Sequence, residues 1–481
     1  MKTVPKLLHV KKDHPIPLDV ISDLQLDRLL SRETLSVLQY PCGESEIKRR
    51  LDVFAFLEKG ENIDRLKTAC SALTDAERSL YRLNEADIPL NRYHCFAQLL
   101  ASYLTACEKL TAFSDSGSLL KDISDFYTSV EKQNLVSQLK KTEGRINALL
   151  EKMRVGLLSL SDKNWLTPDR EAVSEYDRIG ACAQEIGLTV PHKKELKRRI
   201  NRALSDAVCR LYEEETAEIE ALIDRCADVD FREPLSYIGQ IKFFLEIRTL
   251  VEKAEKICAS HCLPTISKER RYAAKDLYDV SLLAKHCDAI VPNDADFTEE
   301  EPFGFLIGAN GGGKTTYLRA VGINLLLFLS GCPVFAKSAE IFPFDAVYTH
   351  FPKDERFDSV GRLDEEKQRT DEMLEEARGK NVFLLFNETY SGTDEAKGFE
   401  LLKKAAEQIQ QDGHFGLYVT HFHDVLSLDH PILSAEVDLS DENKRTFRIA
   451  KAKGKASSYA LDILKKYRLD KRSLAARREK A

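Results

Sequence analysis

Apolar and charged positions follow two different patterns along the 481-residue chain. Between about residues 44 and 262, apolar residues recur every three or four positions with charged residues between them, which is typical of amphipathic helices. Some of these stretches far exceed an average helix, which favours an elongated bundle or coiled coil. We expect nearly all of their apolar residues to serve packing alone. The predicted helices cover 44–60 with Gly60 as the stop, 91–113, 119–153, 191–223 and 234–262.

The pattern changes after about Arg271, where apolar runs of strand length alternate with helical stretches. Such alternation favours a mostly parallel sheet with helices on both faces. A last pair of runs, 435–440 and 445–453, predicts an antiparallel hairpin at the sheet edge. The other predicted strands are 303–308, 345–351, 382–387 and 416–421.

We therefore expect an all-α domain followed by an α/β domain. The expected boundaries are an unassigned N-terminal segment at 1–40, a helical core domain at 41–276, an α/β domain at 277–469 that closes with a helix at 457–467, and a basic tail at 470–481.

Composition supports a globular protein and limits the kinds of partner and cellular compartment that we expect for it. Charged residues make up 31% of the chain and apolar residues 43%. Lys and Arg total 71 against 78 Asp and Glu, for a net charge of -7. This balance excludes a wholly basic nucleic-acid coat but not a local basic surface. The 11 scattered cysteines indicate reduced thiols of a cytoplasmic protein, and without a run of about 18 apolar residues we expect no membrane span.

The stretch most informative about function directly follows the apolar run 303–307. It reads Gly308, four residues, Gly313, Lys314 and Thr315, and continues as a helix, which is the phosphate-binding loop pattern. Glycines let backbone N–H groups converge on phosphate oxygens, and the helix N-terminus adds a positive dipole end. Lys314 is expected to reach the β- and γ-phosphates, and the Thr315 hydroxyl to ligate Mg²⁺. The alternative, a chance glycine-rich turn, is disfavoured by the strand before it and the helix after it.

A second group of residues with a potential chemical role lies at the end of the run 382–387, where Asn387 is followed by Glu388. Ligands of open α/β sheets bind at the carboxyl ends of strands. Glu388 is therefore our candidate for the carboxylate that polarises a water for attack on the γ-phosphate, with Asn387 supporting the Mg²⁺ shell. An amide keeps an acceptor but lacks the charge of a carboxylate, which predicts weaker Mg²⁺ binding and slower turnover. The alternative is a strand-end glutamate without function, which leaves its charge beside an apolar run unexplained.

Two histidines follow the run 416–421. His421 can hydrogen-bond a γ-phosphate or sense its loss, but His423 is equally eligible on chemistry, and either can be a plain surface histidine. The segment 390–394 contains a glycine and precedes a helix, and by itself indicates only a strand-to-helix turn.

Taken together, these motifs resemble the ATPase domain of the MutS family of DNA mismatch-repair proteins, a branch of the ABC-type ATPases. The resemblance rests on 308–322, 384–396 and the strand that ends at His421, with further agreement at 290–297, 331–349 and 457–469. Its order and spacing hold from about Leu277 to Leu469. More weakly, the helix from Glu44 and the long helices resemble the core and lever region of that family.

The resemblance implies an α/β P-loop ATPase domain that binds ATP and Mg²⁺ at the interface of a homodimer, with long helices acting as levers. Glu388 would activate water, His421 would be the switch histidine, and Asn293 resembles the segment near the adenine. The phosphates and Mg²⁺ would be held by Gly308, Asn310, Gly311, Gly312, Gly313, Lys314, Thr315 and Thr316.

The chain also departs from the pattern of the family. We expect a short form, because no N-terminal mismatch-reading domain precedes Glu44. The serine-rich signature loop of the family corresponds to 360–373, where Ser359 is the nearest serine and Arg362 is the substitute contact to the opposing nucleotide. The aspartate of the family is Asn387. The resemblance therefore does not extend to mismatch recognition itself.

These observations predict a MutS-like ATPase that acts on DNA in mismatch repair or recombination and recognises structure rather than sequence. The basic stretches 193–202 and 470–481 are candidate contacts, although each also fits a solvated helix face. The alternative is a slow or inactive ATPase that serves as a nucleotide-dependent scaffold, with ATP closing a dimer. The ATPase partner of a membrane transporter fits less well, because the long helices precede the ATPase motifs.

Overall fold

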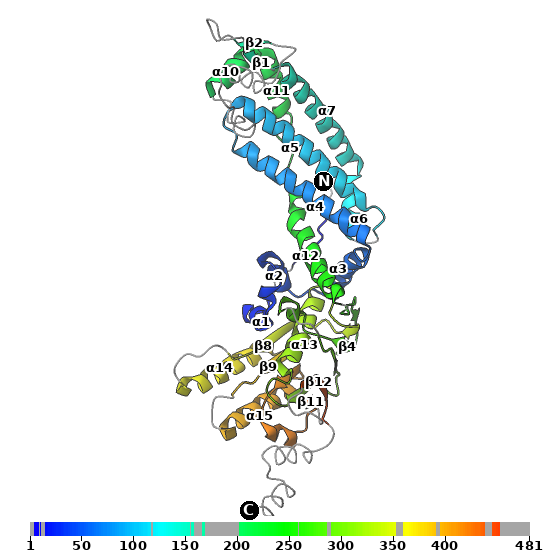
Figure 1. The fold of residues 1–481 in the computed structure, drawn as a ribbon, viewed down its shortest axis with the longest axis vertical. Helices are drawn as coiled ribbons and strands as arrows, with labels where there is room; N and C mark the ends of the chain where they lie inside the picture. The colour runs from blue at the N-terminus through cyan, green and yellow to red at the C-terminus, as the bar shows by residue number, and fades with distance from the viewer. Residues whose placement is uncertain are drawn as a thin grey trace, which may run out of the picture. The chain divides into compact units, whose positions relative to one another are not determined.

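The computed structural model describes residues 4–8, 10, 15–116, 119–153, 155–157, 166–168, 202–257, 259–285, 290–352, 359–390, 395–437 and 445–452. The chain divides into two compact units. One consists of Met1–Leu8 with Phe56–Leu245, and the other of His9–Ala55 with Glu246–Ala481. Figure 1 labels the elements of both units.

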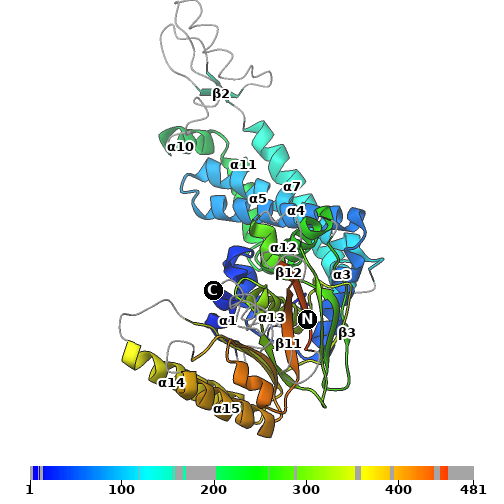
Figure 2. The ribbon, with the colours of Figure 1, turned by 60° about the horizontal axis from the view of Figure 1, so that its bottom comes forward.

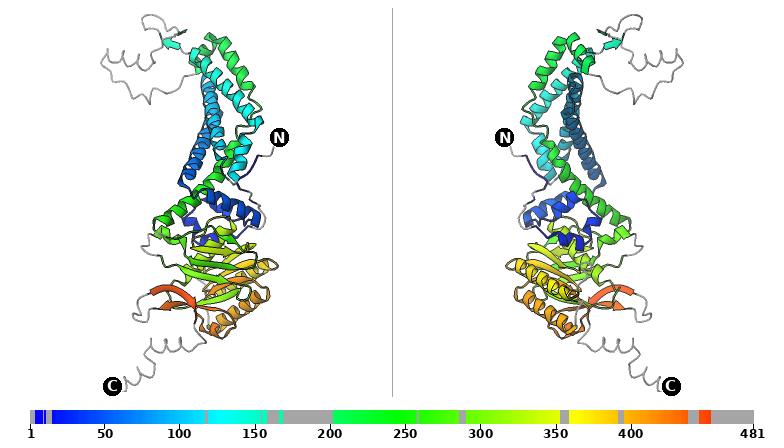
Figure 3. Two further views of the ribbon diagram at one scale, coloured as in Figure 1. Left: turned by 90° about the vertical axis from the view of Figure 1, so that its right-hand side faces the viewer. Right: turned by 90° about the vertical axis from the view of Figure 1, so that its left-hand side faces the viewer.

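The first unit is a bundle of long helices, as the spacing of its apolar residues predicts. Helix α5 (Pro89–Leu110) packs against both α4 (Gly60–Asn84) and α7 (Val130–Lys152), and the three run side by side (Figures 1 and 3). Each buries one apolar stripe, and the largest fully buried side chain of α5 is Tyr103. No helix within the described ranges is long and apolar enough to cross a membrane.

Shorter elements complete this unit. They are α6 (Leu119–Tyr127), a strand pair formed by β1 (Val155–Leu157) and β2 (Leu166–Pro168), α10 (Arg202–Leu211), α11 (Glu213–Asp224) and the first part of α12 (Tyr237–Lys256). The predicted helical residues 191–201 lie outside the described part of the chain.

Four predicted helix boundaries were wrong. The predicted helix 191–223 is interrupted at Tyr212, which has φ -122° and ψ 54°, so α10 ends at Leu211 and α11 begins at Glu213. Gly60 begins α4 and does not end a helix, because the preceding helix has already stopped. The stretch 119–153 is two helices, since Ser129 adopts extended backbone with φ -60° and ψ 149° before the second one begins. The helix predicted at 234–262 ends at Lys256. Periodicity continues through such breaks because both helices bury the same kind of side chain.

The second unit contains a six-stranded sheet in the order β12-β11-β6-β10-β9-β8. Its neighbouring strands are parallel except β11 and β12, so the predicted mostly parallel sheet with an antiparallel edge is confirmed (Figure 2). The strands are β6 (Phe303–Ile307), β8 (Ala346–His350), β9 (Val382–Asn387), β10 (Phe415–Val419), β11 (Ile432–Val437) and β12 (Arg445–Lys451).

Helices cover both faces of this sheet. Alternate strand residues such as Phe305 and Leu384 form one apolar cluster with α14 (Ser359–Ala377) and α15 (Glu395–Gln411). The opposite face packs against α13 (Lys314–Leu329), which contacts β8, β9 and β10. Helix α13 is apolar on nearly all sides, as expected for a helix buried between layers.

A second sheet, in the order β3-β7-β4-β5, was not predicted. Its inner face carries Tyr272 and Phe297, whose rings lie 5.6 and 5.2 Å from the ring of Phe383 in β9. The strands are β3 (Thr265–Ile266), β4 (Tyr272–Leu277), β5 (Asn293–Phe297) and β7 (Ser338–Ile341).

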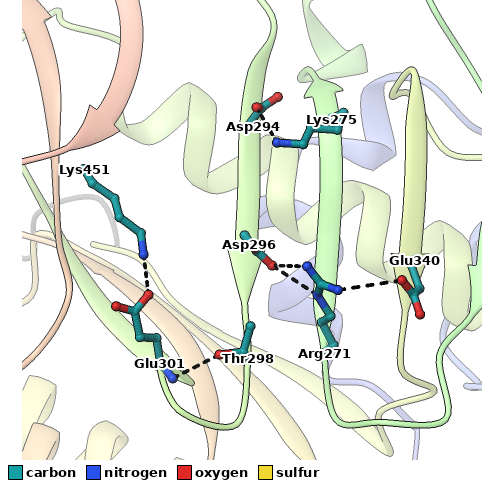
Figure 4. A network of polar contacts seen from close by, with 8 residues as sticks. All are labelled: Arg271, Lys275, Asp294, Asp296, Thr298, Glu301, Glu340 and Lys451. Atoms are coloured by element: carbon teal, nitrogen blue, oxygen red, sulfur yellow. Dashed lines mark hydrogen bonds and ion pairs between the residues drawn. The ribbon is translucent and has the colours of Figure 1, made fainter.

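The outer face of the second sheet carries ion pairs between neighbouring strands (Figure 4). Arg271 lies 3.1 Å from Asp296 and 3.9 Å from Glu340, and Lys275 lies 2.9 Å from Asp294. Solvent screens exposed pairs of this kind, so they contribute more to the choice of pairing strands than to the stability of the unit.

The N-terminal segment, which the sequence pattern left unassigned, is part of the second unit. It forms α1 (Leu18–Asp23) and α2 (Arg32–Leu38). The Asp23 carbonyl accepts a hydrogen bond from Arg319 of α13 at 3.0 Å, and its carboxylate accepts one from Thr349 of β8 at 2.6 Å. Helix α1 is thereby fixed to the helix that follows the glycine-rich loop.

Helix α3 (Glu44–Phe56) holds the other end of α13. Arg50 is fully buried, pairs with Glu46 at 2.9 Å and donates to the carbonyl of Ser330 at 2.9 Å. Ser330 directly follows α13, and a cation at a helix C-terminus interacts favourably with the helix dipole. Both ends of α13 are therefore anchored.

Candidate nucleotide-binding site

The glycine-rich loop 308–313 joins the carboxyl end of β6 to the first turn of α13. Gly308, Gly311 and Gly313 have φ of 138°, 75° and 93°, a region that residues with a Cβ rarely adopt. A Cβ on Gly308 would lie 2.9 Å from that of Ala435, and one on Gly312 would lie 2.9 Å from the carbonyl oxygen of Ala309. The backbone path of the loop therefore requires these glycines.

Lys314 occupies the centre of this loop, and its side chain is only 4% exposed. Its ammonium donates to the carbonyl of Gly308 at 2.8 Å, to that of Ala309 at 3.4 Å and to Oδ1 of Asn310 at 3.2 Å. It also lies 3.5 Å from Oε1 of Glu388. A buried ammonium surrounded by oxygens marks the position as a site of positive potential at a helix N-terminus.

Three strand ends meet beside the loop. Val419 of β10 is in register with both Leu306 of β6 and Asn387 of β9. This alignment brings Asn387 to the start of α13, where Thr315 Oγ1 donates to Asn387 Oδ1 at 3.1 Å. The two oxygen-bearing side chains predicted to support Mg²⁺ are thus in direct contact.

Glu388 follows β9 at the same edge of the sheet. Its side chain is 32% exposed, its backbone φ is 50°, and its N–H donates to the carbonyl of Val419 at 2.8 Å. The carboxylate is therefore close to Lys314 yet accessible to solvent. Such a position suits a group that must meet both a phosphate and a water.

The histidines after β10 differ in exposure. His421 is half-buried, with its ring centroid 4.5 Å from that of Phe422, whereas His423 is exposed and begins a short 3-10 helix. The structure thus places His421 nearer the strand ends, and its role as a switch stays a prediction.

A cavity of about 260 Å³ opens next to the glycine-rich loop. Tyr317 lines it, and burial raises the pKa of this phenol, whose hydroxyl donates to the carbonyl of Asp294 at 2.8 Å. The other wall residues are largely apolar, with one carboxylate among them: Leu277, Tyr278, Asp279, Leu282, Ile290, Val291, Asn293, Gly313, Thr316, Ala320 and Phe447. A small apolar cavity beside a phosphate loop suits a nucleobase.

Asn293 makes two hydrogen bonds that sequence reasoning missed. Its Oδ1 accepts the N–H of Ile449 at 2.7 Å, and its Nδ2 donates to the carbonyl of Phe447 at 3.0 Å. The side-chain amide therefore attaches β5 to β12. This attachment places the ring of Phe447 close to Gly313, where an added Cβ would lie 3.4 Å from the ring.

Phe447 itself was also missed. It is 45% exposed and has a φ of 55°, both unusual for a phenylalanine in a strand. The only signal in the sequence is an aromatic residue within a short, charged edge strand. That signal becomes informative only when β12 is placed beside the loop.

The proposed contacts to an opposing nucleotide are partly described. Ser359 and Arg362 belong to the first turns of α14, but their side chains lie outside the described part of the chain. Residues 391–394 and the predicted helix 457–467 lie entirely outside the described part of the chain.

Comparisons with known proteins bear on this geometry. Residues 305–480 match MutS domain V. The DNA mismatch repair protein MutS of Geobacillus kaustophilus is 24% identical over 449 residues, which cover 80% of this chain and 47% of that protein. MutS of Geobacillus thermodenitrificans is 27% identical over 244 residues, covering 45% of this chain and 26% of the relative. Endonuclease MutS2 of Staphylococcus haemolyticus is 24% identical over 323 residues, which cover 63% of this chain and 40% of that protein.

The chain spans less than half the length of each of these relatives. The matched domain includes the glycine-rich loop, Glu388 and His421, and the alignments extend well beyond it. The C-terminal part of this chain therefore carries a MutS domain V, and the chain is similar to MutS and MutS2 proteins.

Proposed function

We propose that this chain binds ATP with Mg²⁺ and hydrolyses it to ADP and phosphate. The observation that carries the proposal is the convergence of Lys314, Thr315, Asn387 and Glu388 at the N-terminus of α13. Phosphate binding, cation support and water activation need these groups within a few ångströms of each other. Two of the relatives are named DNA mismatch repair proteins, which supports a role of this chain in DNA repair.

Each residue of the cluster has a distinct task in this proposal. Lys314 exchanges its loop carbonyl partners for phosphate oxygens, and the loop N–H groups complete the anion site. Thr315 and Asn387 offer the oxygen ligands that Mg²⁺ prefers, and the ion would neutralise phosphate charge when bound. Glu388 orients and polarises the attacking water. The cavity lined by Asn293, Thr316 and Phe447 accepts the adenine.

A steady-state assay of phosphate release by the full chain, with and without Mg²⁺, tests this proposal. Release that needs Mg²⁺ supports an ATPase. Tight ATP binding without measurable release would instead favour the scaffold function. The amide of Asn387 favours this second function, because it lacks the negative charge with which a carboxylate would bind the cation.

The amide at position 387 leads to a direct prediction. Asn387→Asp should lower the Mg²⁺ concentration for half-maximal phosphate release by about tenfold, because a charge is added beside the cation. Asn381→Asp, which adds the same charge at the opposite end of β9, is the matched control. An unchanged or raised Mg²⁺ requirement in Asn387→Asp would show that position 387 does not support the ion.

We further propose that the chain binds DNA by structure and works as a homodimer with ATP at the interface, where Ser359 and Arg362 contact the opposing nucleotide. The long helices would then convert nucleotide state into movement. The proposed lever role is supported by α3 and α12, because each of these helices contributes residues to both compact units. Of the candidate basic stretches, Arg202 alone is described, and it donates to the carbonyl of Asp87 at 3.1 Å.

DNA binding is predicted to be salt-dependent. With two or more phosphate contacts, affinity for duplex or branched DNA should fall by about tenfold between roughly 50 and 200 mM salt. A salt titration by fluorescence anisotropy measures this, with a panel of DNA structures of equal length. If no DNA binds in a salt-sensitive way, the nucleic-acid part of the proposal is wrong while the ATPase part stands.

A further inference from the structure

The turn that follows β9 has a strained backbone. Glu388 and Tyr390 have φ of 50° and 64°, which place two residues with bulky side chains in the left-handed region. Backbone of this kind persists only where the surrounding structure holds it. Because Glu388 is the proposed water-activating residue, whatever holds this turn also controls the direction of its carboxylate.

Four bonds hold the turn, and one of them is the 2.8 Å bond from the Glu388 N–H to the carbonyl of Val419. Glu366 of α14 accepts the N–H of Tyr390 through Oε2 at 2.7 Å. The Tyr390 hydroxyl donates to Thr370 Oγ1, also of α14, at 2.8 Å. The hydroxyls of Thr389 and Tyr418 are bonded to each other. Helix α14 is therefore attached to the turn at two points.

Of the two bonds from α14, the one from Glu366 bears more directly on Glu388. It fixes the backbone of the turn, whereas the bond to Thr370 fixes the side chain of Tyr390. A carboxylate is also a stronger acceptor than a neutral group. Tyr390 is 2% exposed, and burial raises the pKa of its phenol to about 12, so its own hydroxyl stays neutral in this position.

The other contacts of Glu366 distinguish positioning from general stabilisation. Its carbonyl oxygen lies 3.2 Å from His350 Nε2 and accepts a bond from Thr370 at 2.9 Å. These bonds involve the backbone of α14, so they stay in place when the side chain is changed. A substitution at position 366 therefore removes the bond to the turn and leaves these backbone bonds of α14 in place.

We propose that Glu366 is a positioning residue that holds the turn 388–390 and so directs the Glu388 carboxylate toward the γ-phosphate. This inference rests on the proposed ATPase function. Helix α14 begins with Ser359 and Arg362, the residues proposed to contact an opposing nucleotide. One helix therefore joins the proposed dimer contact to the water-activating residue.

Glu366→Ala, Glu366→Gln and the control Glu365→Ala, an exposed neighbour on the same helix, test the proposal in the full chain. In Glu366→Ala, kcat for phosphate release should fall by about tenfold or more while KM changes by less than about threefold, since one bond to a charged acceptor is lost outside the nucleotide contacts. Glu366→Gln keeps an acceptor and should recover most of kcat. Glu365→Ala should match the wild type.

Hydrogen exchange of the peptide that spans 388–390 gives a readout that does not need turnover. Its exchange in the nucleotide-free protein should rise by about tenfold in Glu366→Ala but not in Glu365→Ala, with the peptides of β4 and β5 unchanged as evidence of a folded unit. Unchanged exchange, or a kcat equal to that of wild type, overturns the inference. If the wild type itself releases no phosphate, the ATPase proposal fails, and exchange still decides whether Glu366 holds the turn.

Discussion

Replacing Lys314 with alanine is expected to weaken ATP binding by about 100-fold or more. Lys314 is the buried cation of the loop, with three loop oxygens as its partners. Each hydrogen bond from an ammonium to a phosphate contributes about 1.5–3 kcal/mol, and about 2.7 kcal/mol corresponds to 100-fold in affinity. Titration with a fluorescent ATP analogue measures the loss directly.

Two further variants make this result specific. Lys314→Met keeps most of the side-chain stem, so a similar loss of affinity would show that the charge, and not the packing, is needed. Lys404→Ala removes an exposed lysine from α15 and should bind ATP as the wild type does. If Lys314→Ala binds within about threefold of the wild type while thermal unfolding shows it folded, the loop does not hold a triphosphate.

The central sheet could be predicted from the sequence because its strands are buried on both faces. Residues 382–386 of β9 are all buried, and the sequence there is an unbroken apolar run. The second sheet could not be predicted in the same way. In β5, buried residues alternate with exposed aspartates, so the strand is short and its charge pattern resembles a loop. Its partner β4 pairs in turn with β7, which follows only after α13 in the chain.

The residues that converge at the glycine-rich loop could also be picked out from the sequence, whereas the cavity beside the loop could not. Gly308, Lys314 and Glu388 carry local signals, since glycine spacing and a charge at a strand end are visible in a single segment. The signal at Phe447 cannot be read from one segment, because the position of this residue over the loop depends on the bonds from Asn293 to β12. Residues 18–38 likewise gave no functional signal, yet Asp23 fixes them to α13.

Replacing Glu388 with glutamine is expected to abolish most turnover and preserve ATP binding. Glutamine has the shape of glutamate but cannot act as a base, so phosphate release should fall by about 100-fold or more. The loss of a negative charge 3.5 Å from Lys314 should leave ATP affinity equal or higher, because one repulsion of the γ-phosphate is removed. Single-turnover release and equilibrium binding, measured on the same preparation, separate these two effects.

The control for this variant is Glu400→Gln, an exposed glutamate of α15 that should leave both quantities unchanged. Turnover within about threefold of the wild type in Glu388→Gln would assign water activation to another group, and His421 would then be tested by His421→Ala. A parallel loss of ATP affinity would mean that Glu388 shapes the loop through Lys314 instead of acting on water. Lys314→Ala and Glu388→Gln thus have opposite signatures, binding lost in the first and chemistry lost in the second, which only a nucleotide hydrolase produces.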